Sequence, residues 1–213
     1  IEKDFEDFSR ELPGKAEEIE KRMETLNADI VIGMKYLYSN MPYSDVGNYT
    51  FDTYLDYVQQ GIWLWENSPY VKKYPELYFL NYVLFHRTND EEIKPCRTYF
   101  WEKIKDRIQG MSMMEAVLEI NHWCAGEVMY QGTDMRTGSA LEIYRSGVGR
   151  CGEEAVFVVN VLRSAGIPAR PVYVPRWSHC DDNHAWVEVW CDGDWHYLGA
   201  CEPEAVLDKG WFT

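Results

Sequence analysis

Hydrophobic residues recur at intervals of three or four along the first 125 residues of the chain. This spacing is typical of amphipathic helices, whose apolar side chains lie on one face. It predicts a long helix over 17–38, broken before Pro42, and a second helix over 51–65 that ends at Pro69. A short apolar segment at 78–85 and two further helices, at 97–108 and 113–123, complete this helical half.

The pattern changes after residue 126, where glycines become frequent and the apolar runs become shorter. An apolar run after Cys151 predicts a buried helix, which ends at Gly166 and Pro168 because both residues stop a helix. Residues 169–175 carry proline near both ends, as expected of an edge strand or a strand start. The Asp-Gly pair at 192–193, between two alternating apolar runs, predicts a β-hairpin.

The hairpin predicts which residues of its two strands lie together. A two-residue loop pairs Trp190 with Trp195 and places His184 opposite Cys201. Because side chains alternate along a strand, His184 shares a face with residue 199 of the other strand. A polar side chain there would be a diagonal neighbour of His184, but the residue is Gly199.

Composition excludes several classes of protein. The chain has 213 residues, 46% of them hydrophobic, which predicts a globular fold with one sizeable core or two small ones. A formal net charge of −14 argues against nucleic acid or an anionic lipid surface as the partner, since both attract clustered cations. No membrane insertion is expected, because no apolar run approaches the roughly 20 residues of a span. The cellular location is left open, although a start at Ile1 is compatible with a trimmed signal and an extracytoplasmic address.

Six cysteines, none in a Cys-x-x-Cys pair, leave the redox state and any disulfide pairing open. Potential metal ligands gather between residues 179 and 201, among them His179, Cys180 and Asp181. Their spacing fits neither the paired knuckle of a structural zinc site nor the helical pair of a catalytic one. We therefore expect no metal and no other cofactor.

The segment Gly-Arg-Cys-Gly-Glu-Glu at 149–154 stands directly before the predicted buried helix. Cys151 then lies in the first turn, where free N–H groups and the helix dipole favour the thiolate. His184 follows 33 residues later, at the start of an alternating strand. A cysteine nucleophile and an imidazole base are the minimum for thiol-dependent acyl transfer. The structural alternatives are an inert buried cysteine and a histidine that only packs.

Four segments of the second half resemble the transglutaminase-like superfamily, which includes transglutaminases, bacterial transglutaminase-like proteins and peptide:N-glycanases. They occur in the family's order, at 149–153, 162–170, 184–190 and 195–202. The resemblance implies a papain-like core, in which a helix carrying the nucleophile packs on an antiparallel sheet carrying the base. It identifies Cys151 as the nucleophile and His184 as the base. We therefore expect an α+β fold, with a helical region over 1–120 packed on a transglutaminase-like catalytic core over 121–213.

The resemblance fails at the third member of the expected catalytic triad. The family places an aspartate four residues after the hairpin tryptophan, and the residue four after Trp195 is Gly199. The following Ala-Cys-Glu fits the peptide:N-glycanase pattern, so the register holds and the carboxylate is missing. Glu202 would replace it by turning inward at an irregular strand end, although strict alternation points it to the opposite face. A water or a backbone carbonyl beside the imidazole is the other candidate.

These residues predict a cysteine-dependent hydrolase or acyl transferase, protease-like or amidase-like, that acts on an amide of a peptide, protein, isopeptide or glycopeptide through a thioester. Transfer to an amine acceptor is less favoured, because nothing in the sequence excludes water in favour of a lysine. Four candidate substrate-binding residues are placed near the expected cleft: Tyr130, Arg176, Trp177 and Asp182. The alternative is a binding or scaffold module that keeps the fold without catalysis, and Gly199 is the residue that supports it.

Overall fold

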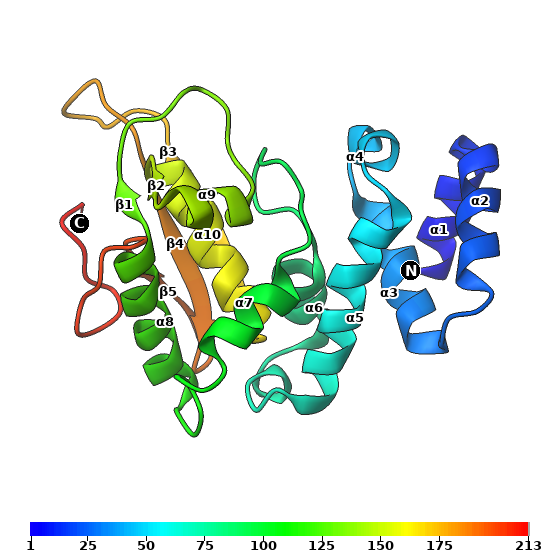
Figure 1. Cartoon of the computed structure of the whole chain (residues 1–213), viewed down its shortest axis with the longest axis horizontal. Helices are drawn as coiled ribbons and strands as arrows, with labels where there is room; N and C mark the ends of the chain where they lie inside the picture. Colours follow the sequence, from blue (N-terminus) through cyan, green and yellow to red (C-terminus); the bar gives the residue numbers. More distant parts are fainter. Residues whose placement is uncertain (213) are drawn as a thin grey trace.

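The first half of the protein is helical, as its hydrophobic pattern predicts. The computed structural model describes residues 1–212. The elements of this half are α1 (Glu2–Glu11), α2 (Pro13–Met23), α3 (Ala28–Asn40), α4 (Tyr43–Asn48), α5 (Phe51–Asn67), the 3₁₀ turn η1 (Val71–Lys73), α6 (Glu76–Phe79), the π-helical turn η2 (Leu80–Leu84) and α7 (Arg97–Ile104). They run from the right-hand edge toward the centre of Figure 1, coloured from blue to green.

The predicted helix over 17–38 is wrong in one respect, because this region forms two helices. α2 ends at Met23, and α3 begins after Asn27, whose side chain accepts a hydrogen bond from the Ile30 N–H at 2.9 Å. Asparagine favours this N-cap position because its side-chain oxygen satisfies a free amide of the first turn. The apolar spacing continues across the gap, so periodicity alone does not reveal the break.

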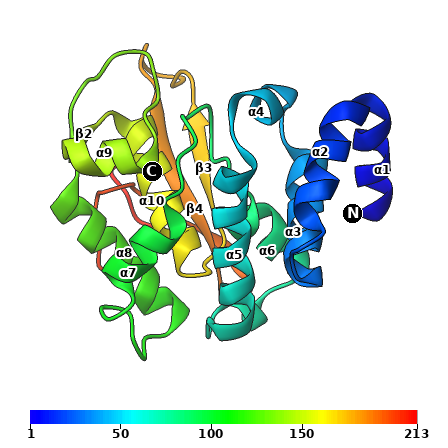
Figure 2. The same ribbon diagram turned by 45° about the vertical axis from the view of Figure 1, so that its right-hand side comes forward.

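The second half combines helices with two small sheets. Its helices are α8 (Met113–Glu127), α9 (Ala140–Ser146) and α10 (Cys151–Ser164). β1 (Met129–Tyr130) pairs in parallel with β2 (Val148–Gly149), and an antiparallel sheet has the order β3 (Ala169–Val174), β4 (His184–Cys191), β5 (Asp194–Leu198). α10 lies against β3 and β4 (Figures 1 and 2). A helix layer on an antiparallel sheet is an α+β fold, so the predicted fold class is confirmed.

Helix α10 is the centre of this fold. Every residue from Glu153 to Ser164 is buried, and the helix also packs against α7, α8 and α9 (Figure 1). It ends where the sequence predicts, with Gly166 at a φ of 82°. A side chain at Gly166 would meet Ser68 and Val71 and would be strained by the left-handed backbone, so only glycine fits.

Burial of α10 forces its polar side chains to find partners inside the protein. Arg163 is 3% exposed, and its guanidinium donates to the carbonyl oxygens of Phe85 (3.1 Å), Arg87 (3.0 Å) and Ala169 (3.0 Å). Burial, reinforced by the nearby Arg97 cation, lowers the pKa of Arg163 to about 9. The side chain thereby fastens two distant segments, the start of β3 and the chain after η2, to one point of the helix.

The hairpin keeps its predicted register near the loop but ends early. Trp190 pairs with Trp195, as predicted, and the last pair is Val187 with Leu198. Beyond Leu198 the chain leaves the sheet, and Cys201 adopts a left-handed conformation with a φ of 58°. The predicted pairing of His184 with Cys201 is therefore wrong, because a turn replaces the end of the strand.

The predicted division between residues 120 and 121 falls inside α8 and stays a prediction. Buried side chains of both halves, from Phe5 to Leu207, form one hydrophobic cluster. Within residues 1–212, no helix has the length and apolarity that crossing a membrane requires.

We expect Arg163→Met to lower the free energy of unfolding by about 2–4 kcal/mol, because three buried carbonyl oxygens lose their donor. Urea unfolding followed by tryptophan fluorescence measures the change. Arg145→Met is the matched control, since Arg145 is exposed on α9 and should change stability by less than about 0.5 kcal/mol. Equal unfolding midpoints for the two variants would contradict the anchoring role of Arg163.

Candidate active site

Cys151 is the first residue of α10 and lines a cavity of about 530 Å³. Asn183 and Ala185, the residues on either side of His184, line the same cavity. Tyr173 of β3 forms part of its wall, and Met135 and Thr137 of the glycine-rich segment form another. The fold therefore brings the predicted nucleophile beside the start of the strand that carries the predicted base.

Two backbone donors accompany the thiol. The N–H groups of Glu153 and Glu154 donate to the Arg150 carbonyl at 2.8 and 2.9 Å. Those of Cys151 and Gly152 have no acceptor within residues 1–212. Unbonded N–H groups at a helix N-terminus bind anions and stabilise the oxyanion formed when a thiolate attacks a carbonyl.

Glu153 holds the glycine-rich segment against the start of α10. Its Oε2 accepts hydrogen bonds from Thr133 Oγ1 (2.5 Å) and the Arg150 N–H (3.1 Å), and its Oε1 accepts one from the Gly138 N–H (3.2 Å). The Arg150 guanidinium donates to Thr137 Oγ1 at 2.9 Å. One buried carboxylate thus fixes the cavity wall relative to Cys151, a role that the sequence motif did not reveal.

His184 begins β4 and is 7% exposed among aromatic rings. Its ring centroid lies 4.7 Å from that of Trp211 and 5.0 Å from that of Phe212. Burial lowers the pKa of His184 and outweighs the nearby carboxylates of Glu202 and Asp182, which raise it. The imidazole is therefore neutral at pH 7 and able to accept a proton.

Glu202 occupies the space that a side chain at position 199 would fill. A Cβ built on Gly199 would lie 2.8 Å from Glu202 Cβ and closer still to its Oε2. The chain reverses here, because Cys201 is left-handed and the Glu202 N–H donates to the Gly199 carbonyl at 3.2 Å. Glu202 does not belong to a strand, so the alternation of side chains along a strand does not point it away from the face that carries His184.

The carboxylate of Glu202 is held by Trp211 and not by His184. The Trp211 indole N–H lies 2.9 and 3.0 Å from the two carboxylate oxygens. His184 Nε2 is buried and has no hydrogen-bond partner in the described part of the chain. Within residues 1–212, no hydrogen bond joins His184 to either Glu202 or Cys151, so the structure places the carboxylate near the imidazole without bonding the two.

Asn121 of α8 holds the turn that carries Glu202, a role that no local sequence motif indicates. It is 2% exposed and donates to the carbonyl oxygens of Gly199 (2.9 Å) and Glu202 (3.3 Å). Its side-chain oxygen accepts the Cys201 N–H at 3.0 Å. The available signal was a lone asparagine at a buried position of an otherwise apolar helix face.

Glu154 is a second acidic group that the sequence analysis did not place. It lies one helical turn after Cys151 and is 5% exposed. Burial raises the pKa of Glu154 to about 8, and the nearby Glu202 carboxylate adds to the effect. Glu154 is therefore mostly protonated at pH 7.

Two of the predicted substrate-binding residues lie close to His184. The Trp177 ring lies 6.5 Å from that of His184 and stacks on Trp186, with 6.3 Å between centroids and 8° between planes. Asp182 accepts the Trp177 N–H through its backbone carbonyl at 3.0 Å. Neither residue lines the Cys151 cavity, so they flank the base and not the nucleophile.

The other two predicted substrate-binding residues lie farther from this group. Arg176 is exposed and forms an ion pair with Asp181 at 3.2 Å. Tyr130 is 69% exposed at the end of β1, where its backbone pairs with Gly149. Neither residue lines the Cys151 cavity, and their role in substrate binding stays a prediction.

The six cysteines are all free thiols. Burial raises the pKa of Cys96 to about 11 and that of Cys191 to about 12, and it raises the pKa values of Cys124 and Cys201 strongly. Cys151 is partly exposed and Cys180 is exposed, which leaves these two thiols accessible to reagents. Over residues 1–212, no group of three or more His, Cys, Asp and Glu side chains could hold a metal ion.

Comparison with known proteins identifies the class of this region. Residues 102–200 match the family model of the transglutaminase-like superfamily, which confirms the resemblance predicted from the motifs. This part of the chain is therefore similar to the cysteine-based enzymes of that superfamily.

A crystal structure from Cytophaga hutchinsonii, described as that of a putative cysteine protease, is similar to part of the chain. The match has 23% sequence identity and a TM-score of 0.41, and it covers 50% of this chain. It spans 36% of the other protein. No curated protein gives a significant match.

We expect Gly199→Ala to destabilise the protein by about 1–3 kcal/mol, because the new Cβ overlaps Glu202. In a Glu202→Ala background the same change should destabilise the protein much less, because the side chain that the new Cβ would overlap is absent. Thermal unfolding of the four proteins measures this coupling. Gly132→Ala is the control, because a Cβ there meets nothing within 4 Å. Equal effects of Gly199→Ala in the two backgrounds would show that Glu202 does not fill this space.

We expect Glu154→Gln to stabilise the protein increasingly as the pH rises. The unfolded chain releases this proton near its ordinary pKa of 4.5, whereas the folded protein keeps it up to about pH 8. The free energy of unfolding of the wild type therefore falls between these values, by an amount on the order of a few kcal/mol. Denaturant unfolding should show equal stability of wild type and variant at pH 4 and a difference at pH 8. Glu17→Gln, at an exposed position, should show no such trend.

Proposed function

We propose that this protein is a cysteine hydrolase that cleaves an amide bond of a peptide, isopeptide or glycopeptide through a thioester on Cys151. The observation that carries the proposal is the placement of Cys151 in an open cavity, with two unbonded N–H groups beside it and the start of β4 as a neighbouring wall. The match of residues 102–200 to a superfamily of cysteine enzymes supports the same chemistry.

The reaction begins with attack of the Cys151 sulfur on the amide carbon. His184 takes the thiol proton, and the N–H groups of Cys151 and Gly152 donate to the oxyanion. The tetrahedral adduct collapses, the carbon–nitrogen bond breaks, and His184 gives the proton to the leaving amine. Water then attacks the thioester with His184 as base, which releases the acid and restores the thiol.

Glu202 takes the place of the absent aspartate in this proposal. It fills the space above Gly199, opposes the lowering of the His184 pKa by burial, and lies near an imidazole nitrogen that has no hydrogen-bond partner within residues 1–212. A carboxylate in that position favours the imidazolium formed when His184 accepts the thiol proton. The hydrogen bonds from the Trp211 indole N–H limit the orientations that the Glu202 carboxylate can adopt.

Hydrolysis is favoured over transfer because the cavity opens beside exposed segments. Asn89 and Asp90, which line it, are both exposed, and Tyr173 is 60% exposed. Water reaches such a site freely, and an amine acceptor would need its own binding surface to compete. The flanking residues Trp177 and Asp182, with Arg176 and Tyr130 farther out, remain the candidates for holding the leaving group.

One observation favours a second candidate function, a binding module without catalysis. Within residues 1–212, neither Cys151 nor Glu202 is hydrogen-bonded to His184. A site that no longer catalyses a reaction does not need these hydrogen bonds. The predicted reactivity of Cys151 distinguishes the two functions.

We expect iodoacetamide to modify Cys151 well below pH 8.5, the ordinary pKa of a free thiol. His184→Ala should slow this reaction at pH 7 by about tenfold or more, and Glu202→Gln should slow it by a smaller factor, since the imidazolium loses its charge partner. The rate is measured against pH, with the modified site assigned by mass spectrometry. The exposed Cys180 is an internal control in each sample and should not respond to either substitution.

If Cys151 reacts like Cys180 and ignores His184, the enzyme proposal fails and the binding module replaces it. If the pair is active, glutamine peptides offered with an amine probe decide between the reactions. Release of ammonia or product faster than incorporation of the amine supports hydrolysis, and the reverse order identifies a transferase.

A further inference from the structure

A larger cavity, of about 990 Å³, adjoins the one that holds Cys151. It is lined by residues of α4, by the 87–92 segment and by the glycine-rich segment around Met135. The two cavities share Asn89, Asp90, Met135 and Thr137 among their lining residues. A chain that binds with its reacting amide at Cys151 can therefore continue into the larger space.

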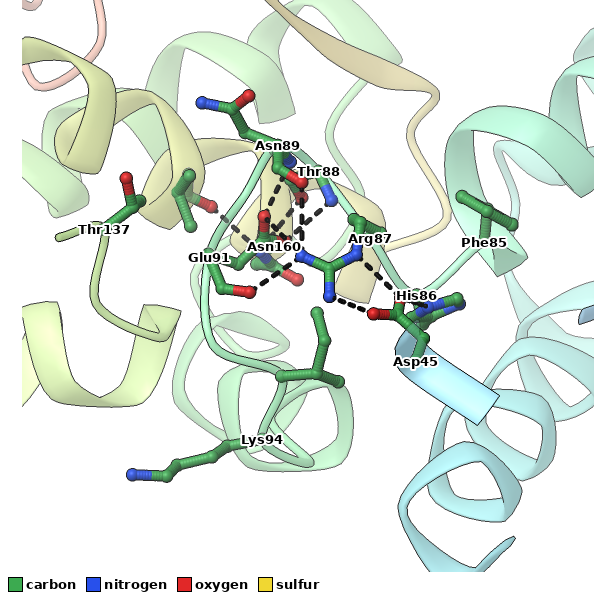
Figure 3. Close-up of polar contacts among 12 residues, drawn as sticks. Asp45, Phe85, His86, Arg87, Thr88, Asn89, Glu91, Lys94, Thr137 and Asn160 are labelled. Carbon is green, nitrogen blue, oxygen red and sulfur yellow. Dashed lines mark hydrogen bonds and ion pairs between the residues drawn. The ribbon is translucent and has the colours of Figure 1, made fainter. Parts of the chain in front are cut away.

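The segment between the two cavities is held rigidly by buried charges (Figure 3). The Arg87 guanidinium donates to both carboxylate oxygens of Asp45 at 2.6 and 2.7 Å and to the Glu91 carbonyl at 2.8 Å. The Glu91 carboxylate accepts the N–H groups of Thr88 (2.7 Å) and Asn89 (2.6 Å). These bonds close the segment on itself and leave the Asn89 side chain outside the network (Figure 3).

The same segment is anchored to the protein core and to the cavity wall. Arg163 donates to the Arg87 carbonyl at 3.0 Å, and Asn160 donates to Thr88 Oγ1 at 3.2 Å. The Glu92 N–H donates to the Thr137 carbonyl at 3.3 Å. The positions of residues 89 and 90 relative to α10 are thus fixed from three directions.

The carboxylates that line the larger cavity have partners, with one exception. Those with hydrogen bonds or ion pairs are Asp45, Glu91, Glu92, Asp134, Glu142 and Glu153. Asp90 is exposed and makes no hydrogen bond or ion pair with any residue from 1 to 212. The two arginines of the lining, Arg87 and Arg136, are already paired with Asp45 and Asp134. Among the carboxylates that line the larger cavity, Asp90 is therefore the one without a protein partner in residues 1–212, and it lies where the two cavities meet.

We propose that this groove receives a lysine or arginine side chain of a peptide substrate and that Asp90 is its counter-ion. The inference deepens the proposed function and rests on it, because it places the cation beside an amide bound at Cys151. A carboxylate carried on a rigid backbone segment loses less conformational freedom when it binds a cation, and the net charge of −14 draws cations toward the protein. Asn89, whose side chain is also unpartnered, is placed to bond the substrate backbone.

Two alkylating probes of equal length test this inference. Bromoacetyl-lysine amide carries the cation, and bromoacetyl-norleucine amide has the same carbon chain without it. The second-order rate of modification at Cys151 is measured for each probe by mass spectrometry at low salt. We expect the lysine probe to react about five- to tenfold faster with the wild type, and Asp90→Asn to bring the ratio close to one.

The control is Asp192→Asn, which removes the same charge at the hairpin loop, at the opposite end of β4 from His184. It should leave the lysine-to-norleucine ratio unchanged, which separates a local counter-ion from the overall charge. A ratio near one in the wild type, or one unaffected by Asp90→Asn, overturns the inference while the norleucine rate still reports an active thiol. If the norleucine probe modifies Cys151 no faster than Cys180, the proposed function fails and this inference fails with it.

Discussion

The burial of α10 is the constraint on which the rest of the structure depends. A helix enclosed from Glu153 to Ser164 cannot leave a polar side chain without a partner, since an unsatisfied group in the interior costs several times what a surface bond is worth. Arg163 and Asn160 are satisfied by the chain that follows η2, and Glu153 by the glycine-rich segment. The side chains that make the helix compatible with the core thereby build two walls of the cavity around Cys151.

The turn at 199–202 brings the carboxylate of Glu202 into the space that a side chain at position 199 would occupy. Gly199 leaves a space, and the left-handed Cys201 folds Glu202 back into it. Asn121 satisfies the backbone of the turn from within α8. In the proposed site, Glu202 therefore supplies a carboxylate near His184 although position 199 carries no side chain. Asn121 would act through Glu202, as a positioning residue of that proposed site.

Charge is distributed unevenly over this acidic protein. Near His184, the raised pKa of Glu154 favours the uncharged form of this carboxyl. Across the larger cavity, the lining carboxylates other than Asp90 bond to arginines, Lys94, a hydroxyl or backbone amides. Within residues 1–212, Asp90 is thus the lining carboxylate left free to pair with a cation in the proposed groove.

Local sequence signals were enough to predict most of the elements, and they supplied the candidates for the site. The apolar run after Cys151 and the Gly166–Pro168 stop define α10, and the Asp-Gly pair defines the hairpin, because such signals act over a few neighbouring residues. The sequence did not show the break at Asn27, where a capping bond interrupts an unchanged apolar period. The course of the chain after Leu198, the burial of Glu154 and the hydrogen bonds of Asn121 to the 199–202 turn are visible only in the folded protein. Each of these depends on contacts between α8, α10 and the end of β5, which are distant in sequence and therefore leave no periodic pattern.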